Sequence, residues 1–342
     1  MRAMILNSIT NLEHNSEPLK MSSLPKPVPA SDEVLIKVLA CGVCHTELDE
    51  IEGRTAPARF PIIPGHQVVG IVESTGTKVK SLKQGDRIGV GWIFSSCGKC
   101  SFCLSGLENL CSKFVATGRD VNGGYAEYMT VPESSAYPVP AIFSDVQVAP
   151  LLCAGAVGYR ALKLSGIKDG QNIGLTGFGA SAHLVLQMVK HSFPKTKIFV
   201  FARSESERKF ARELGAFQAG DIEDCLSDQM DSIIDTTPAW KPVMDSLKIL
   251  KPGGRLVINA IRKEETDKNQ LLELEYSKHL WLEKEIKSVA NVARKDIEEF
   301  LQLAAEIPIL PEIQEYKLEE ANIALTELKQ RKIRGAKVLV MG

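Results

Sequence analysis

A net charge is almost absent from this chain of 342 residues, which carries 41 Lys and Arg against 42 Asp and Glu. Because the positive and negative charges are nearly equal in number and no long basic run occurs, the protein has no positive electrostatic potential that would bind a polyanion. We therefore expect neither nucleic acid nor an anionic membrane surface as a partner.

Long hydrophobic runs are also missing. No stretch approaches the roughly 20 apolar residues of a membrane span, and the first residues, MRAMILNSITNLE, lack the apolar core and cleavage site of a secretory signal. We expect no membrane association and a cytoplasmic location. Eight cysteines in such a chain favour reduced thiols and metal binding over a disulfide framework.

The composition and length indicate a folded protein of more than one domain. The chain is 44% hydrophobic and 24% charged, as globular proteins are, and its length predicts about two domains. The first part has the short β-branched runs of an irregular all-β domain, at 34–38, 68–74, 85–92 and 125–131. From Gly170, apolar strands alternate with amphipathic segments, which predicts a parallel sheet covered by helices, with strands at 172–176, 197–201, 231–235, 255–260 and 286–290.

Helix signals support this division. Ser204, with Glu207 three residues later, forms a capping box that predicts a helix through Glu213, ending at Gly215. After residue 292, two helical patterns at 294–306 and 318–329 lead to an apolar closing strand at 336–342. That strand could extend the parallel sheet or return to the first domain, and periodicity does not decide between them.

Four cysteines lie close together in a polar loop: Cys97, Cys100, Cys103 and Cys111. Four thiolates at this spacing can close a tetrahedral Zn²⁺ shell with no position left for a substrate, so we expect a structural zinc site. An iron–sulfur cluster is the alternative, because it accepts the same four ligands.

A second metal site is indicated by Cys44 and His66, which lie among turn residues. One thiolate and one imidazole suit Zn²⁺, but a catalytic zinc usually has three protein ligands. The residues alone leave the third ligand open among Cys41, His45, Cys153 and Cys225.

A glycine turn at residues 177–182 indicates a dinucleotide site. It follows the strand at 172–176 and opens a helical segment, with the pattern Gly177-Phe178-Gly179 and then Ala182. The glycines allow a sharp turn and a close approach of a pyrophosphate to the helix N-terminus, and the small Ala182 permits close helix packing.

The end of the next strand bears on which cofactor this turn would bind. Arg203 and Ser204 stand there in place of the carboxylate that would bind a ribose hydroxyl. We therefore expect NADP(H) in preference to NAD(H); the alternative is that Arg203 is only a surface charge.

Taken together, these motifs resemble the zinc-containing medium-chain alcohol dehydrogenases over essentially the whole chain. The matching segments are CGVCHT at 41–46, PGH at 64–66, the cysteine loop at 97–111, LLCAG at 151–155, GFGASA at 177–182 and KIRG at 332–335. The resemblance implies an α/β protein with a GroES-like irregular β domain at 1–155, holding both zinc sites. It also implies a Rossmann doubly wound parallel-sheet domain at 156–292 and a segment at 293–342 that returns to the first domain.

The resemblance also implies roles for individual residues. Cys44, His66 and Cys153 would hold the catalytic zinc, and His45 would contact the cofactor pyrophosphate. Thr46 matches the hydroxyl that receives the substrate proton, and Glu47 matches the acid that orients the ligand histidine. Residues at the positions of an apolar substrate pocket are Trp92, Ile93 and Val157.

Three positions depart from the family pattern. Gln67 stands where a Glu usually follows the ligand histidine, and Asp49 stands where some members place a relay histidine. Ala336 replaces an arginine that often contacts the cofactor, and Lys337 follows it as a possible substitute.

The implied function is an alcohol dehydrogenase or aldehyde reductase with two zinc ions per chain, acting on a small alcohol or aldehyde as a homo-oligomer, a dimer or a tetramer. Two rivals stay open: an enoyl reductase of the same superfamily, and a non-catalytic zinc-thiolate module that binds a protein or senses redox state.

Overall fold

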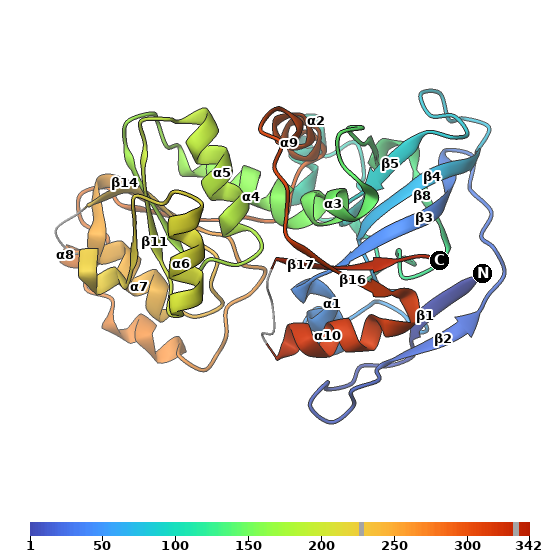
Figure 1. Cartoon of the computed structure of the whole chain (residues 1–342), viewed down its shortest axis with the longest axis horizontal. Helices are drawn as coiled ribbons and strands as arrows, with labels where there is room; N and C mark the ends of the chain where they lie inside the picture. The colour runs from blue at the N-terminus through green and yellow to red at the C-terminus, as the bar shows by residue number, and fades with distance from the viewer. Residues whose placement is uncertain (226–228, 331–334) are drawn as a thin grey trace. The chain divides into compact units, whose positions relative to one another are not determined.

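The computed structural model describes residues 1–225, 229–330 and 335–342. It divides into two compact units: the first unit is Met1–Cys153 with Ala293–Gly342, and the second unit is Ala154–Val292. Both termini lie in the first unit (Figure 1). None of the helices within the described ranges is long and apolar enough to cross a membrane.

The first unit is built on a mainly antiparallel sheet with the strand order β16-β17-β3-β4-β5-β9, and β8 also pairs with β3. The strands are β3 (Glu33–Val43), β4 (Gln67–Thr75), β5 (Arg87–Val90), β8 (Tyr128–Pro132), β9 (Ala136–Pro138), β16 (Ile313–Lys317) and β17 (Ala336–Val340). Two small sheets pair β1 (Arg2–Leu6) with β2 (Leu19–Ser23) and β6 (Ile93–Ser95) with β7 (Val115–Ala116).

Short helices fill the connections of this unit. They are α1 (His45–Ile51), α2 (Ser101–Leu104), η1 (Glu108–Leu110), η2 (Glu133–Ser135), α3 (Asp145–Pro150), α9 (Arg294–Glu306), η6 (Leu318–Glu320) and α10 (Ala321–Lys329). The π-helical turn η3 (Leu151–Gly155) leads out of the unit.

Side-chain periodicity explains the core of the first unit. Alternate residues of β3, such as Val34 and Ile36, are buried in one cluster with Ala321, Leu325 and Leu328 of α10. Val34 and Ile36 are two residues apart, as on one face of a strand, and the three residues of α10 are four and three apart, as on one face of a helix. Each element therefore has an apolar side for the same core.

The closing strand returns to the first unit. In β17, Leu339 lies opposite Cys41 of β3 in antiparallel register, and Ile313 of β16 pairs with Ala336 in parallel. The pairing that periodicity left open is thus decided in favour of the first domain.

The second unit is a parallel sheet of six strands with the order β12-β11-β10-β13-β14-β15. The strands are β10 (Asn172–Thr176), β11 (Lys197–Phe201), β12 (Gln218–Gly220), β13 (Met230–Asp235), β14 (Leu250–Ile258) and β15 (Glu285–Ser288). The helices are α4 (Ala156–Ser165), α5 (Ala182–Ser192), α6 (Glu205–Glu213), η4 (Ile222–Cys225), α7 (Lys241–Ile249), η5 (Lys268–Glu273) and α8 (Tyr276–His279). The expected class, a GroES-like β domain with a Rossmann-type parallel sheet, is confirmed.

The order of strands in this sheet reverses at β10, whose neighbours are β11 and β13. Ligands of such sheets bind outside the carboxyl ends of the strands at the point of reversal. Helix α6 begins and ends as the capping box predicts, because Ser204 Oγ accepts the N–H of Glu207 and the chain turns at Gly215.

Candidate active site

The first unit brings together two cysteine thiols and one imidazole. The ligand atoms of Cys44, His66 and Cys153 all lie within 4.8 Å of one another. Cys44 precedes α1, His66 precedes β4, and Cys153 lies in the π-helical turn η3. The three come from distant parts of the chain, and their donor set suits Zn²⁺ with one position open.

His66 is oriented as a metal ligand would be. Its Nδ1 atom is 2.5 Å from Glu47 Oε1, and both side chains are almost completely buried. Its Nε2 atom is also buried and has no hydrogen-bond partner in the described residues. A buried ring nitrogen without a partner is costly, so a metal ion at this position would satisfy Nε2.

Glu47 also fixes the first thiol ligand. Its Oε2 atom accepts the backbone N–H of Cys44 at 2.8 Å, as in a capping box at the start of α1. One carboxylate therefore holds the backbone of one expected ligand and the ring of another. This arrangement of an outer acid behind a ligand histidine is typical of zinc sites.

The two thiols share their proton unequally. A hydrogen bond from Cys153 lowers the pKa of the Cys44 thiol well below its ordinary value, although burial opposes this, and His66 adds to the effect. The same hydrogen bond, together with burial, raises the pKa of Cys153. One thiolate is thus favoured at this site before any metal is bound, which is the protonation state that a zinc ligand requires.

The turn before His66 depends on glycine. Gly65 has φ +100°, and a Cβ atom there would lie 2.4 Å from Cδ1 of the buried Tyr125. A residue with a Cβ atom would therefore be both strained and in collision with Tyr125 at this position. The Pro-Gly-His segment therefore sets the direction in which His66 leaves the turn.

Three other expected residues lie on or next to α1. Thr46 is buried, and its hydroxyl is 3.6 Å from Cys44 Sγ. Asp49 is 2% exposed and accepts the Nε–H of Arg54 at 2.5 Å. His45 is exposed, so the three differ in their access to solvent.

Two of the alternative ligands stay outside the set. Cys41 is completely buried, and its Sγ donates to the carbonyl of Gly42. His45 is exposed and belongs to neither metal-ligand group found among the described residues. The side chain of Cys225 lies outside the described structure.

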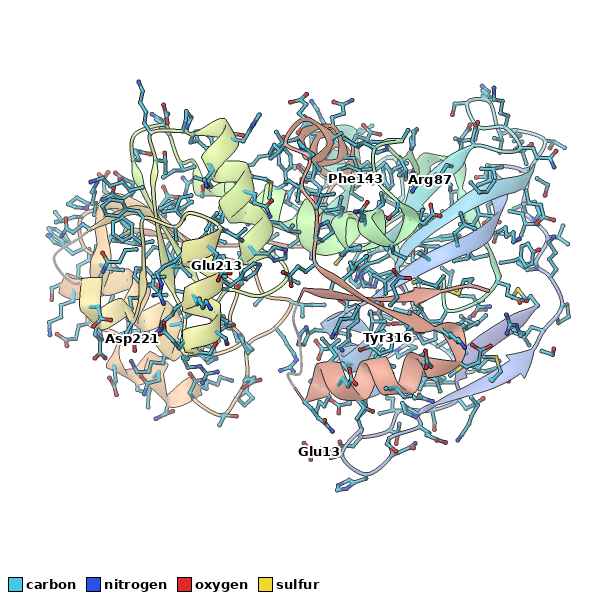
Figure 2. All side chains as sticks on the ribbon, in the orientation of Figure 1. Glu13, Arg87, Phe143, Glu213, Asp221 and Tyr316 are labelled. Carbon is cyan, nitrogen blue, oxygen red and sulfur yellow. The ribbon has the colours of Figure 1, made fainter. Side chains whose placement is uncertain are left out.

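The structure also locates the departures from the family pattern. Gln67 is buried against Gly42, where a Cβ atom would lie 2.7 Å from Gln67 Oε1. Lys337 is 2% exposed, and its Nζ donates to Glu327, Tyr316 and Gln314. Tyr316 is labelled in Figure 2. The ammonium group of Lys337 is thus already bound within the first unit, while residues 332–334 of the KIRG segment lie outside the described residues.

One buried acid was missed by the reading of the sequence. Glu50 is 1% exposed, and burial, reinforced by the nearby Glu47 carboxylate, raises its pKa well above the ordinary value. His66, Trp92 and Arg119 are also among its electrostatic neighbours. The available signal was its position three residues after Glu47, which places both acids on one face of α1.

The four cysteines of the polar loop form a second ligand set. Their sulfur atoms lie within 4.8 Å of one another. Backbone N–H groups of Lys99 and Cys100 lower the pKa of Cys97 to about 6, which favours a thiolate. The set has four protein ligands and so fits a closed, structural site.

The glycine turn of the second unit has the geometry of a dinucleotide site. Gly177 has φ +77°, and a Cβ atom there would lie 2.9 Å from Thr236 Oγ1. A Cβ atom on Gly179 would meet nothing within 4 Å, so this backbone faces open space. Phe178 and Ala182 are buried and close the turn from inside. The residues present thus fit the phosphate cradle that the sequence predicts.

Arg203 and Ser204 follow β11 and are both exposed. The hydroxyl of Ser204 caps α6 and bonds to Glu207. Arg208 is committed elsewhere, because it donates to the carbonyl of Ala202 and to Asp221, which is labelled in Figure 2. Arg203 is therefore the exposed cation at this strand end.

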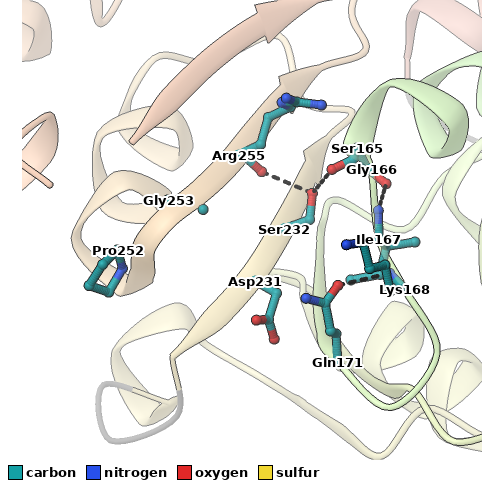
Figure 3. A pocket seen from close by; sticks show the side chains of 11 residues that line it. Ser165, Gly166, Ile167, Lys168, Gln171, Asp231, Ser232, Pro252, Gly253 and Arg255 are labelled. Carbon is teal, nitrogen blue, oxygen red and sulfur yellow. Dashed lines mark hydrogen bonds between the residues drawn. The ribbon is translucent and has the colours of Figure 1, made fainter. Parts of the chain in front are cut away.

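A separate cavity of about 280 Å³ lies at the opposite, amino ends of β10, β13 and β14 (Figure 3). Its polar groups bond to one another: Ser232 donates to the carbonyls of Ser165 and Arg255. Because the glycine turn lies at the carboxyl ends, this cavity is not part of the candidate cofactor site.

Comparison with known proteins agrees with this geometry. Residues 30–141 match the family model of the alcohol dehydrogenase GroES-like domain. The chain is 39% identical over 329 residues to the probable alcohol dehydrogenase AdhA of Mycobacterium tuberculosis (strain CDC 1551 / Oshkosh), covering 95% of this chain and 93% of that one. It is 34% identical to an alcohol dehydrogenase of Geobacillus stearothermophilus, covering 94% of this chain and 95% of the relative.

A solved structure is similar over nearly the whole length. It is the CAD from Helicobacter pylori complexed with NADP(H), with a TM-score of 0.84, 26% identity and 99% of each chain covered. The chain belongs to the zinc-containing medium-chain alcohol dehydrogenase family. It is an oxidoreductase of alcohols and aldehydes.

Proposed function

We propose that this chain is a zinc-dependent alcohol dehydrogenase or aldehyde reductase that prefers NADP(H). The observation that carries the proposal is the convergence of Cys44, His66 and Cys153, with the unpartnered Nε2 of His66 directed into the set and Glu47 behind it. Three protein ligands leave one position for a substrate oxygen. Zinc held by these residues would supply a Lewis acid for that oxygen, and a nicotinamide cofactor would supply the hydride chemistry at the carbon.

The chain's own residues would orient the substrate and move its proton. Thr46 stands beside Cys44, so its hydroxyl would take the proton of an alcohol being oxidised and return it when a carbonyl is reduced. His45 is exposed and would connect this path to solvent. Asp49 is shielded from solvent and holds Arg54, which makes it an inner acid of the same path.

Substitution of Cys44 by Ser and of Thr46 by Val tests this mechanism. We expect both variants to fold and both to lose turnover of alcohols and aldehydes, with Thr46→Val keeping its zinc. Folding is checked by circular dichroism and zinc by elemental analysis. Near wild-type turnover in either variant would exclude the mechanism.

A substrate panel separates the superfamily rivals. We expect turnover of simple alcohols and aldehydes and none of enoyl thioesters. Preferential reduction of the enoyl thioesters would favour the enoyl reductase. A chain that binds zinc but no nicotinamide cofactor would favour the non-catalytic zinc-thiolate module.

The cofactor preference rests on Arg203. An exposed guanidinium directly after β11, at the position where an acid would bind the ribose hydroxyl of NAD(H), suits a 2′-phosphate. The H. pylori neighbour is complexed with NADP(H), which supports the same preference. The test compares kcat/KM for NADPH and NADH with one aldehyde, and a clear advantage of NADH would overturn it.

The proposal also includes a second, structural zinc, a homo-oligomer and a reducing compartment such as the cytoplasm. The cysteines of both ligand sets are free thiols, as metal binding requires. Strand β15 at the edge of the parallel sheet is exposed, as are Trp281 and Leu282 before it. An exposed sheet edge with apolar side chains next to it is a surface that a second copy would cover. Sedimentation analysis should find a dimer or tetramer, and a monomer at micromolar concentration would contradict this.

A further inference from the structure

A buried ion pair in the second unit has no part in the proposed chemistry. The side chains of Lys263 and Asp235 are 8% and 0% exposed, and Lys263 Nζ donates to Asp235 Oδ2. Removing two charges from water is costly unless further hydrogen bonds satisfy both groups. The partners of each group therefore show what the pair holds in place.

Lys263 holds the loop that follows β13. Besides Asp235, its ammonium group donates to the carbonyl oxygens of Thr237 and Ala239, each at 2.9 Å. All three of its N–H donors are thus used. Since Lys263 itself lies in the segment after β14, one side chain fastens together two loops at the carboxyl ends of neighbouring strands.

Asp235 connects these loops to the dinucleotide turn. Its Oδ1 atom accepts the hydroxyl of Thr176 at 2.8 Å and both the N–H and the hydroxyl of Thr237. Thr176 is the last residue of β10, directly before Gly177. Thr236, next to Asp235, forms the wall that leaves no room for a Cβ atom on Gly177. The ion pair therefore fixes the loop against the glycine turn.

We propose that Lys263 is a positioning residue for the nicotinamide dinucleotide. It shapes the loop after β13 beside the glycine turn and compensates the buried carboxylate of Asp235, so that an anionic cofactor can bind at these strand ends. This inference rests on the proposed function, since it presupposes a dinucleotide at the Gly177 turn.

Lys263→Met tests the inference in the zinc-loaded full chain. We expect the Kd of NADPH and of NADH, measured by cofactor fluorescence, to rise at least about tenfold, because the loop beside the glycine turn loses the donor that holds it. The matched control is Lys268→Met, which removes an exposed lysine paired with Glu265 in the same unit. It should leave both Kd values unchanged.

A double variant protects the test against misfolding. Asp235→Asn with Lys263→Met removes both buried charges, so we expect its thermal unfolding midpoint to lie above that of Lys263→Met alone. Its cofactor Kd should stay raised, because the carbonyls of Thr237 and Ala239 still lack their donor. A folded single or double variant that binds both cofactors as the wild type does would overturn the positioning role.

Measurements on the wild type separate a failure of the proposed function from a failure of the role proposed for Lys263. If the unaltered, zinc-loaded protein bound neither cofactor, the proposed function would fail. If it bound them and turned over aldehydes while Lys263→Met bound them equally well, only the role of Lys263 would fail.

Discussion

The two ring nitrogens of His66 have different environments, and this difference matters most at the scale of single residues. Nδ1 is held by Glu47, while Nε2 is buried without a partner among the described residues. A hydrogen bond on one nitrogen sets the tautomer and directs the other towards a metal. The affinity of His66 for a metal ion should therefore depend on Glu47.

Glu47→Gln should weaken zinc binding at this site. The amide keeps the size of the side chain but loses the charge behind His66, and loss of such an outer partner lowers metal affinity about 10- to 100-fold. Competition with a chelator measures the effect. Glu13→Gln, which removes an exposed carboxylate of the same unit (Figure 2), should bind zinc as the wild type does. Unchanged affinity in Glu47→Gln would show that Glu47 does not orient the ring.

Arg203→Ala should reduce the preference for the phosphorylated cofactor. We expect kcat/KM for NADPH to fall about tenfold or more and that for NADH to change little, because only the phosphate loses a charge-assisted contact. Lys209→Ala removes an exposed cation from the neighbouring helix α6 and serves as control. An equal fall with both cofactors would assign Arg203 a structural role instead.

At the scale of elements, α1 and the turn η3 carry most of the candidate site. The capping box of α1 places Glu47 beside Cys44, and η3 presents Cys153 from a π-helical turn. Such turns occur frequently at functional sites because they interrupt the regular helix bonding. Neither element is long, so their conformation depends on the packing around them.

The loop at residues 80–82 has an anchor whose strength depends on pH. Ser81, through its hydroxyl and its backbone N–H, together with the N–H groups of Lys80 and Leu82, lowers the pKa of Glu133 from 4.5 to about 2. The stabilisation by a carboxyl group with a lowered pKa is complete above pH 4.5 and is lost as the pH falls towards 2.

Hydrogen exchange measures this anchor. In Glu133→Gln at neutral pH, the amides of Lys80, Ser81 and Leu82 should exchange faster than in the wild type, because an amide oxygen is a weaker acceptor than a carboxylate. Glu73→Gln is the control, because it removes a half-buried carboxylate of β4 that pairs with Lys26 and does not contact the loop. Equal protection in Glu133→Gln and wild type would show that the carboxylate does not hold the loop.

At the scale of the whole molecule, the ligand sets and the dinucleotide turn are divided between the units. Both cysteine-containing ligand sets lie in the first unit, and the glycine turn lies in the second. The first unit is discontinuous in sequence, because β17 returns to pair with β3. The proposed metal ligands therefore come from one unit and the proposed cofactor cradle from the other.

Elemental analysis should find two zinc ions per chain. We expect Cys44→Ser to lose one ion. The effect on thermal stability should be small, because an open site with three protein ligands contributes less to folding than a closed site with four. Cys97→Ser should lose the other ion and unfold at a lower temperature, because a closed four-thiolate site contributes to folding. Iron in the purified protein, or one ion in the wild type, would contradict this count.

Much of the fold could be predicted because its signals are local. The strand at 172–176, the helix that begins after Ser204 and the helical pattern at 294–306 all match elements of the structure. The four-cysteine loop was equally accessible, since its ligands are close in sequence. Glu50 was missed because its burial depends on surrounding elements, although its helical spacing from Glu47 was visible.

The sequence by itself determined the elements, the glycine turn and the residue types available for metal binding, since these depend on neighbours along the chain. The tertiary structure decided which distant residues meet. It placed Cys153 beside Cys44 and His66, paired β17 with β3, and joined Lys263 to Asp235. These contacts depend on how strands and loops pack in three dimensions, and the resemblance to a family could suggest only the first two.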